Sequence, residues 1–175
     1  KKKYKEDLNE RFKKGEFIHA DSIHFPDSLK YTTRKQGRIV YGGGGIMPDY
    51  FIPLDTTRYN KYHRDLAAKG SIINTCLRYI DSHREELANR YKEFDSFNRK
   101  FEITPELLQQ LIENGKKAGV KYDEALYTDA LPLLKVQMKA LIARDLWEMN
   151  EYFRIMNEED ASVMKAVELL QKGKK

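Results

Sequence analysis

Six serines are the first candidates for chemistry in this sequence. A nucleophilic serine needs a general base within hydrogen-bond reach and donors that hold an oxyanion. None of the six lies in a Gly-x-Ser-x-Gly elbow or in a comparable turn of small residues. Two suit turns and two suit helix starts, so we expect no nucleophile constellation in this chain. The serines are Ser22, Ser28, Ser71, Ser82, Ser96 and Ser162.

A metal site is the second chemistry that the residue types allow. His19 and His24 lie among Asp21 and Asp27, and histidine and carboxylate side chains bind zinc. The segment shows no helical ligand spacing, so we expect a solvated loop, no metal and no other cofactor. The single cysteine, Cys76, excludes a disulfide within the chain and a cysteine-based zinc site.

The remaining titratable clusters lie in stretches with helical patterns. His63 and His83 are surrounded by charged residues, and we expect both to be exposed. The carboxylates at Glu85-Glu86 and at 158–160 fit solvated helix faces or first turns.

The most unusual local feature is a run of four glycines, Gly42 to Gly45. Residues without Cβ adopt positive φ and let another chain approach closely. A phosphate-binding loop is excluded, because Ile46-Met47-Pro48 follows where Gly-Lys-Ser/Thr is needed. A dinucleotide fingerprint fails because no helix follows directly. A backbone site beside a bound peptide and a tight structural crossing remain, and the residues alone favour the structural crossing.

Charge and hydropathy narrow the class of protein. The formal net charge is +5, and lysines at the two ends of the chain supply much of it. Because the body of the chain is close to neutral, we expect no nucleic-acid partner. No apolar run approaches the ~20 residues of a membrane helix. Lys1 is not a native start, so we expect the chain to begin inside a longer protein, with any targeting signal upstream.

The pattern of the sequence changes near Thr56. Tyr4–Lys14 predicts a short helix that stops at Gly15. Residues 29–33 and 38–41 predict a β-hairpin around the turn Arg34–Gly37, and Asp49–Leu54 predicts an extended segment. We therefore expect an α+β fold, mainly α, with residues 1–56 as one domain and residues 57–175 as a helical domain of about five helices.

Apolar residues at helical spacing locate those five helices. Ser71 is expected to cap the second helix, and Thr104-Pro105-Glu106 to open the third. Pro132 fits only the first turn of the fourth helix. The expected helices are 57–68, 71–89, 104 to between Gly115 and Gly119, 129–153 and 158–171.

Four of the five helices have an expected inward stripe. The aromatic residues at 91, 94, 97 and 101 are expected to pack in the core or against a partner. The stripes are Ile72, Ile73, Cys76, Leu77 and Ile80; Leu107, Leu108, Leu111 and Ile112; Leu134, Met138, Leu141, Ile142, Leu146, Met149 and Phe153; and Val163, Ala166, Val167 and Leu170.

The segment Gly37 to Pro53, GRIVYGGGGIMPDYFIP, resembles the carboxyl-terminal processing (tail-specific) serine proteases, particularly their Bacteroidetes-type members. The resemblance covers nearly the whole chain. The glycine–Ile–x–Pro–Asp string is its most specific part, and the short matches in the helical region are less specific. The matching segments are Gly37-Arg38, Val40-Tyr41, the four glycines, Ile46, Pro48-Asp49, residues 53–57, Asp21-Ser22-Ile23, Leu29-Lys30-Tyr31, Tyr122-Asp123-Glu124, 143–147 and 157–160.

The resemblance implies a parent protein with a PDZ domain and an α/β protease core that uses a Ser–Lys dyad. In that mechanism a neutral lysine is the general base and backbone amides hold the oxyanion. Both dyad residues precede the glycine run in the family, so no catalytic residue is expected in this chain. A structural or substrate-adjacent strand beside the core is expected for Gly42, Gly43, Gly44, Gly45, Pro48 and Asp49.

Two hypotheses follow for function. The first is a non-catalytic C-terminal region of a periplasmic or cell-envelope serine endopeptidase that cleaves protein C-termini. Its partners would be the protease core and PDZ domain of the same parent chain and protein or peptide substrates, and a homo-oligomer is left open. The alternative is a stand-alone helical protein-interaction module without a proteolytic role.

Overall fold

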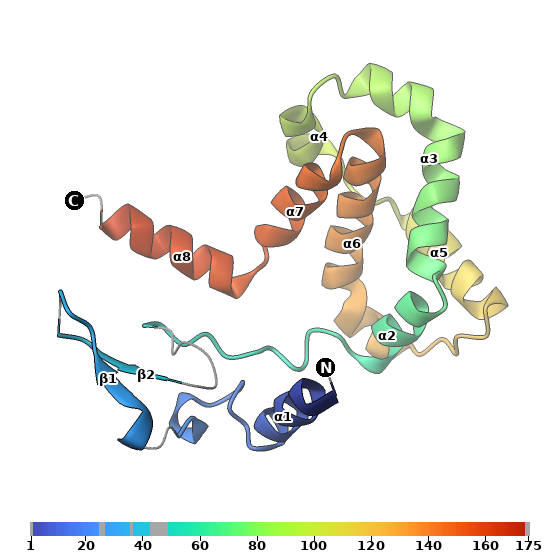
Figure 1. Cartoon of the computed structure of the whole chain (residues 1–175). Helices are drawn as coiled ribbons and strands as arrows, with labels where there is room; N and C mark the ends of the chain where they lie inside the picture. Colours follow the sequence, from blue (N-terminus) through green and yellow to red (C-terminus); the bar gives the residue numbers. More distant parts are fainter. Residues whose placement is uncertain (1, 25–26, 36, 43–48, 174–175) are drawn as a thin grey trace. The chain divides into compact units, whose positions relative to one another are not determined.

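The computed structural model describes residues 2–24, 27–35, 37–42 and 49–173 of this 175-residue chain. Contacts divide the chain into two compact units, Lys1–Thr56 and Thr57–Lys175. The described residues contain eight α-helices and one antiparallel hairpin (Figure 1). The predicted fold class, α+β and mainly α, is confirmed.

The N-terminal unit consists of a helix, two short 3-10 turns and the hairpin. Helix α1 spans Lys2–Lys13, and Gly15 follows it with a φ of 78°, which suits a residue without Cβ. Strand β1 (Lys30–Thr32) pairs with strand β2 (Ile39–Tyr41), and Tyr31 lies opposite Val40. The predicted hairpin is therefore present. The residues at 49–54 form no strand.

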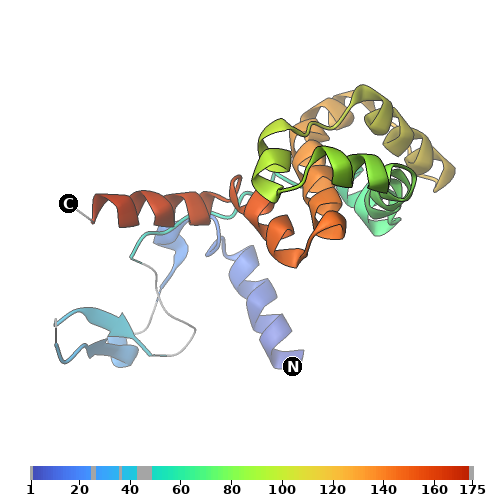
Figure 2. The same ribbon diagram turned by 90° about the horizontal axis from the view of Figure 1, so that it is seen from above.

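The described part of the helical unit, residues 57–173, contains seven α-helices, two more than predicted. Helix α6 packs against α2, α3 and α7, and α3 also packs against α5 (Figures 1 and 2). The extra helices arise because a short helix around Phe97 was not predicted and because one long predicted helix is two. The helices are α2 (Lys61–Ala68), α3 (Ser71–Arg90), α4 (Phe94–Lys100), α5 (Pro105–Lys117), α6 (Glu124–Leu146), α7 (Met149–Asn157) and α8 (Ala161–Lys172).

Polar side chains determine where several helices begin. Asn60 accepts a hydrogen bond from the His63 amide, so α2 begins at Lys61 and not at Thr57 as predicted. Thr104 caps α5 as predicted. The prediction for Ser71 was wrong, because Gly70, with a φ of 67°, is the N-cap of α3 and Ser71 is its first helical residue.

An aromatic cluster fills one end of the helical core. Phe97 is fully buried and stacks on Phe101 with ring centroids 4.5 Å apart. Tyr91 meets Phe97 edge-on at 5.4 Å, and Phe94 meets Trp147 edge-on at 5.9 Å. Such arrangements suit the ring quadrupoles. The predicted aromatic residues are therefore core residues.

The same cluster explains why the predicted helix 129–153 is wrong. Trp147 has φ −124° and ψ −104°, so α6 ends at Leu146 and the chain turns into α7. The ring centroids of Trp147 and Phe97 lie 5.3 Å apart, and this contact holds the turn in place. The turn leaves Met149 and Phe153 each 52% exposed, where the straight helix predicted burial.

Two further predicted stripes are less buried than predicted. In α3, Ile72, Cys76 and Ile80 are buried, but Ile73 and Leu77 lie at the surface. In α8 the stripe of Val163, Ala166, Val167 and Leu170 was predicted to face inward. No residue of α8 is buried, and Leu170 is 69% exposed.

Pro132 lies inside α6, more than two turns from its start, where only the first turn was predicted. Its ring removes the amide that would bond the Thr128 carbonyl. Both residues are exposed, so water can hydrate that carbonyl. No described helix combines the length and apolar character needed to cross a membrane.

Replacing Pro132 should therefore stabilise the protein. Pro132→Ala restores a helical hydrogen bond at an exposed site, and we expect the free energy of unfolding to rise by about 1–2 kcal/mol. Urea unfolding followed by circular dichroism measures it. Pro105→Ala, at the first position of α5, is the matched control and should not stabilise. Equal effects of the two substitutions would contradict this account of Pro132.

Candidate functional site

The structure describes two residues of the predicted substrate-adjacent strand, Gly42 and Asp49. The other four, Gly43, Gly44, Gly45 and Pro48, lie outside the described residues. The Gly42 amide donates to the Leu29 carbonyl at 2.7 Å, which continues the pairing of β2 with β1. A Cβ at Gly42 would lie 2.8 Å from Cε2 of Tyr31, so the glycine permits a close approach between backbone and ring.

An ion pair joins the two ends of this segment. The guanidinium of Arg38, the residue before β2, contacts the Asp49 carboxylate. Both side chains are more than half exposed, so the pair contributes little free energy. It nevertheless joins Arg38 and Asp49, which belong to two matching segments of the resemblance on either side of the glycine run in the sequence.

The hairpin presents apolar side chains to solvent. Tyr31 and Val40, paired on one face, are 57% and 41% exposed, and Ile39 on the other face is 56% exposed; we call these three residues the hairpin surface. No described residue of 1–56 is buried. A two-stranded hairpin alone is marginally stable, and its open edges can pair with another chain. The hairpin surface is therefore the candidate functional site, and its chemistry is that of a docking surface.

The described serines and lysines do not form a Ser–Lys dyad. Burial lowers the pKa of Lys139, which is what a general-base lysine requires. However, its ammonium group donates to the carbonyl oxygen of Asn98 at 2.6 Å, which ties α6 to α4. Ser82 donates to the Arg78 carbonyl within its own helix. These side chains have structural roles.

The single cysteine is also structural. Cys76 is completely buried in α3, and burial raises the pKa of its thiol to about 12. A thiol in that state is a poor nucleophile at neutral pH. Its Sγ atom lies 3.8 Å from the Met138 carbonyl oxygen, so the residue packs α3 against α6.

The histidines differ in their surroundings. The prediction that His63 is exposed was wrong: it is 3% exposed, and its Nε2 lies 2.7 Å from Oε1 of Gln137. His83 is half-buried and stacks on Tyr79. His19 and His24 are exposed. No group of three or more possible metal ligands occurs among the described residues.

The contact between His63 and Gln137 could not be read from the sequence. The two residues are 74 positions apart, and no local pattern connects them. Burial lowers the pKa of His63, and the hydrogen bond to Gln137 only partly opposes this. The imidazole is therefore a neutral core residue at physiological pH.

Comparisons with known proteins concern mainly the helical unit. A model described as Family of unknown function (DUF8443) matches residues 62–148, which run from α2 to just beyond α6. Pyruvate, phosphate dikinase of Rickettsia bellii (strain RML369-C) is 35% identical over 122 residues. The alignment covers 68% of this chain and 13% of the dikinase, so the chain spans a small part of that relative. No solved structure matches.

Burial of His63 should make stability depend on pH. The unfolded chain binds a proton at His63 with a pKa near 6.5, whereas the folded state binds it only at lower pH. The unfolding free energy should therefore be fully retained above about pH 7. It should fall on acidification, by at most about 1.4 kcal/mol per pH unit.

Urea unfolding between about pH 5 and 8 measures this slope. His63→Gln should remove the His63 contribution, and His83→Gln should keep it. An unchanged slope in the His63→Gln variant would show that another group causes the dependence.

Proposed function

We propose that this chain is the non-catalytic C-terminal region of a carboxyl-terminal processing serine endopeptidase. The parent would act in the periplasm or cell envelope and shorten proteins from their C-terminal tails. In this proposal residues 1–56 complete the protease core, and residues 57–175 form a helical domain that supports the core, substrate binding or assembly.

One observation carries the proposal: the N-terminal unit has no buried side chain among its described residues. A segment that buries little apolar area cannot offset the entropy of ordering its backbone. Tyr31, Ile39 and Val40 lie on short strands with open edges, which suits addition to a larger sheet. The resemblance of the segment 37–53 to the processing proteases indicates which sheet that would be.

The proposed role of the glycine run follows from the same geometry. Gly42 already allows the ring of Tyr31 to approach the backbone. Beside a protease core, a run of such residues would let a neighbouring strand or a peptide approach equally closely. The catalytic serine and lysine would come from the core.

The similarity to the dikinase does not change this proposal. The alignment involves 13% of that enzyme's length, which supports a shared segment and not a shared activity. The family model matching residues 62–148 is described as of unknown function, so it is compatible with either hypothesis.

A stand-alone helical interaction module is the second candidate. The observation that favours it is the exposed apolar stripe of α8, where Met164, Val167 and Leu170 are 51%, 41% and 69% exposed. Residues three apart lie on one helix face, so the stripe could pack in a groove of a partner.

Peptidase assays separate the two candidates. The product of the complete reading frame and the 175-residue chain are each incubated with a protein that has an unfolded C-terminal tail. Intact mass spectrometry follows the shortening of that tail. We expect the complete protein to cleave and the 175-residue chain to be inactive.

Two results would reject the proposal. A complete protein that leaves the tail intact would favour the interaction module. Cleavage by the 175-residue chain, lost when one of its own serines is replaced by alanine, would show that the chain itself is catalytic.

A second test concerns the N-terminal unit. Because the described residues of 1–56 contribute no buried side chain, the chain 57–175 should unfold within about 2 °C of the full 175 residues, which corresponds to less than about 1 kcal/mol. Differential scanning calorimetry measures both. Adding the separately expressed catalytic core should raise the unfolding temperature of the 175-residue chain but not that of 57–175. Equal effects on both chains would contradict docking through residues 1–56.

A further inference from the structure

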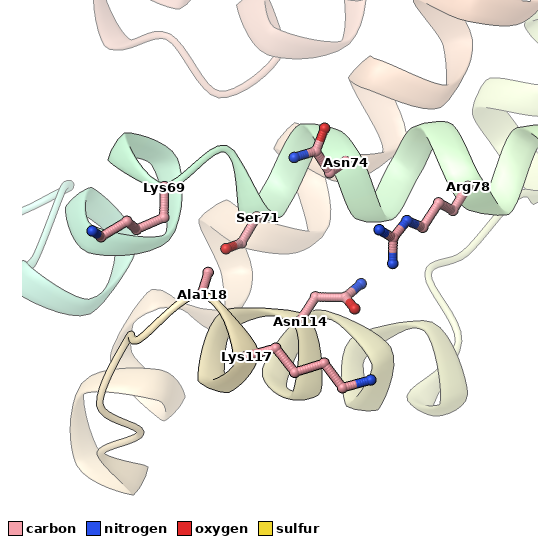
Figure 3. A pocket seen from close by; sticks show the side chains of 7 residues that line it. All are labelled: Lys69, Ser71, Asn74, Arg78, Asn114, Lys117 and Ala118. Carbon is pink, nitrogen blue, oxygen red and sulfur yellow. The ribbon is translucent and has the colours of Figure 1, made fainter.

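A pocket of about 260 Å³ lies between the start of α3 and the second half of α5 (Figure 3). All the residues that line it belong to the helical unit. It has room for several water molecules, each of which takes about 30 Å³ in the liquid. The polar and charged side chains that line it are Lys69, Ser71, Asn74, Arg78, Asn114 and Lys117.

The lining of the pocket is cationic. Lys69, Arg78 and Lys117 contribute three positive charges, and no carboxylate of the described residues lines it. None of the ion pairs found among the described residues involves these three side chains. All three side chains are exposed; the Arg78 guanidinium points toward α5, whereas the Lys69 ammonium points away from it, so Arg78 is the cation best placed to meet an anion (Figure 3).

The backbone adds further positive potential. Helix α3 is 20 residues long, and its first amide groups point out of its N-terminus without helical acceptors. Its N-cap is Gly70, which has no side chain to accept from them, and its first turn contains no acidic residue. A helix start of this kind is suited to an anion.

Ser71 provides an independent indication of a ligand. The residue is 3% exposed, and its Oγ is buried without a hydrogen-bond partner. Its hydroxyl points from α3 toward α5, into the pocket (Figure 3). Leaving a buried hydroxyl unpaired is costly, whereas an anion in the pocket would accept its hydrogen bond.

The remaining polar residues shape the wall. The Asn114 amide donates to Thr75 Oγ1 at 2.9 Å, and Thr75 donates to the Ser71 carbonyl at 2.7 Å. This chain of hydrogen bonds holds α5 against the first turn of α3. Arg78 extends toward α5 on one side of the pocket, and Asn74 is exposed at its edge (Figure 3).

We propose that this pocket binds a phosphate group, either inorganic phosphate or the phosphate of a small monoester. A phosphate carries about 1.5–2 negative charges at neutral pH and several acceptor oxygens. It therefore matches the Arg78 cation, the neighbouring lysines and the Ser71 hydroxyl better than a carboxylate, which carries one charge. The volume leaves room for an attached organic group. This site is independent of the proposed proteolytic role of the parent.

Nuclear magnetic resonance titration of the 175-residue chain tests the proposal. Inorganic phosphate, glycerol phosphate and acetate are added separately at constant ionic strength, with sodium chloride as the balancing salt. We expect saturable shifts of the Ser71, Ile72 and Ile73 amides with phosphate or glycerol phosphate. Acetate should bind at least about tenfold more weakly, because it offers fewer charge-assisted contacts.

Variants that remove charge inside and outside the pocket lining test whether the pocket is responsible. The double variant Arg78→Gln, Lys117→Gln should weaken phosphate binding by about tenfold or more. Lys121→Gln removes one exposed charge outside the pocket lining and should change the affinity by less than about twofold.

Ser71→Ala separates binding from folding. Removing an unpaired buried hydroxyl should leave the unfolding temperature in phosphate-free buffer unchanged or raised. The same substitution should reduce the increase in unfolding temperature that phosphate causes in the unmodified chain.

Three results would overturn the proposal. The first is no saturable shift with either phosphate compound. The second is acetate binding as tightly as phosphate, and the third is equal loss of binding in Lys121→Gln and in the pocket variants. Tighter binding of glycerol phosphate than of inorganic phosphate would support an organic phosphate as the ligand, and the reverse would support the free ion.

Discussion

The helical unit depends on the burial of α6. Leu134, Met138 and Ile142 of this helix are completely buried, each worth about 1.5–3 kcal/mol when removed from water. Ala140 and Ala143 are buried as well, and such small side chains let neighbouring helices approach closely. Because α2, α3 and α7 all pack on α6, their positions follow from this one helix. That burial also explains how α6 tolerates a proline in its interior, since tertiary packing and not local propensity holds it.

The N-terminal unit is organised by different forces. Its hairpin is held by backbone hydrogen bonds, the Arg38–Asp49 pair and the packing of Tyr31 on Gly42, all near the surface. None of these contacts excludes much apolar area from water, so they contribute little net free energy. The two units therefore differ in what stabilises them. That difference favours a role for residues 1–56 as part of a larger folded body, whereas residues 57–175 have a core of their own.

The cationic pocket shows how helix packing creates chemistry without a sequence motif. Ser71 lies in the first turn of α3, while Asn114 and Lys117 lie near the end of α5. Packing of α3 against α5 brings these residues together, and the glycine at the N-cap leaves the helix start uncapped by a side chain. The same serine looked like an ordinary helix cap in the sequence. Only its unpaired, buried hydroxyl in a pocket with a cationic lining suggests a ligand.

The sequence by itself determined the features that depend on local chemistry. The hairpin around residues 33–38, the cap at Thr104 and the change of pattern near Thr56 all follow from short-range propensities, and so does the mainly helical class. The tertiary structure decided whatever depends on distant partners. It buried His63 against Gln137, ended α6 at Trp147 by packing the indole on Phe97, and left the α8 stripe exposed. The physical reason is that periodicity identifies an apolar face, whereas burial depends on whether another element covers that face.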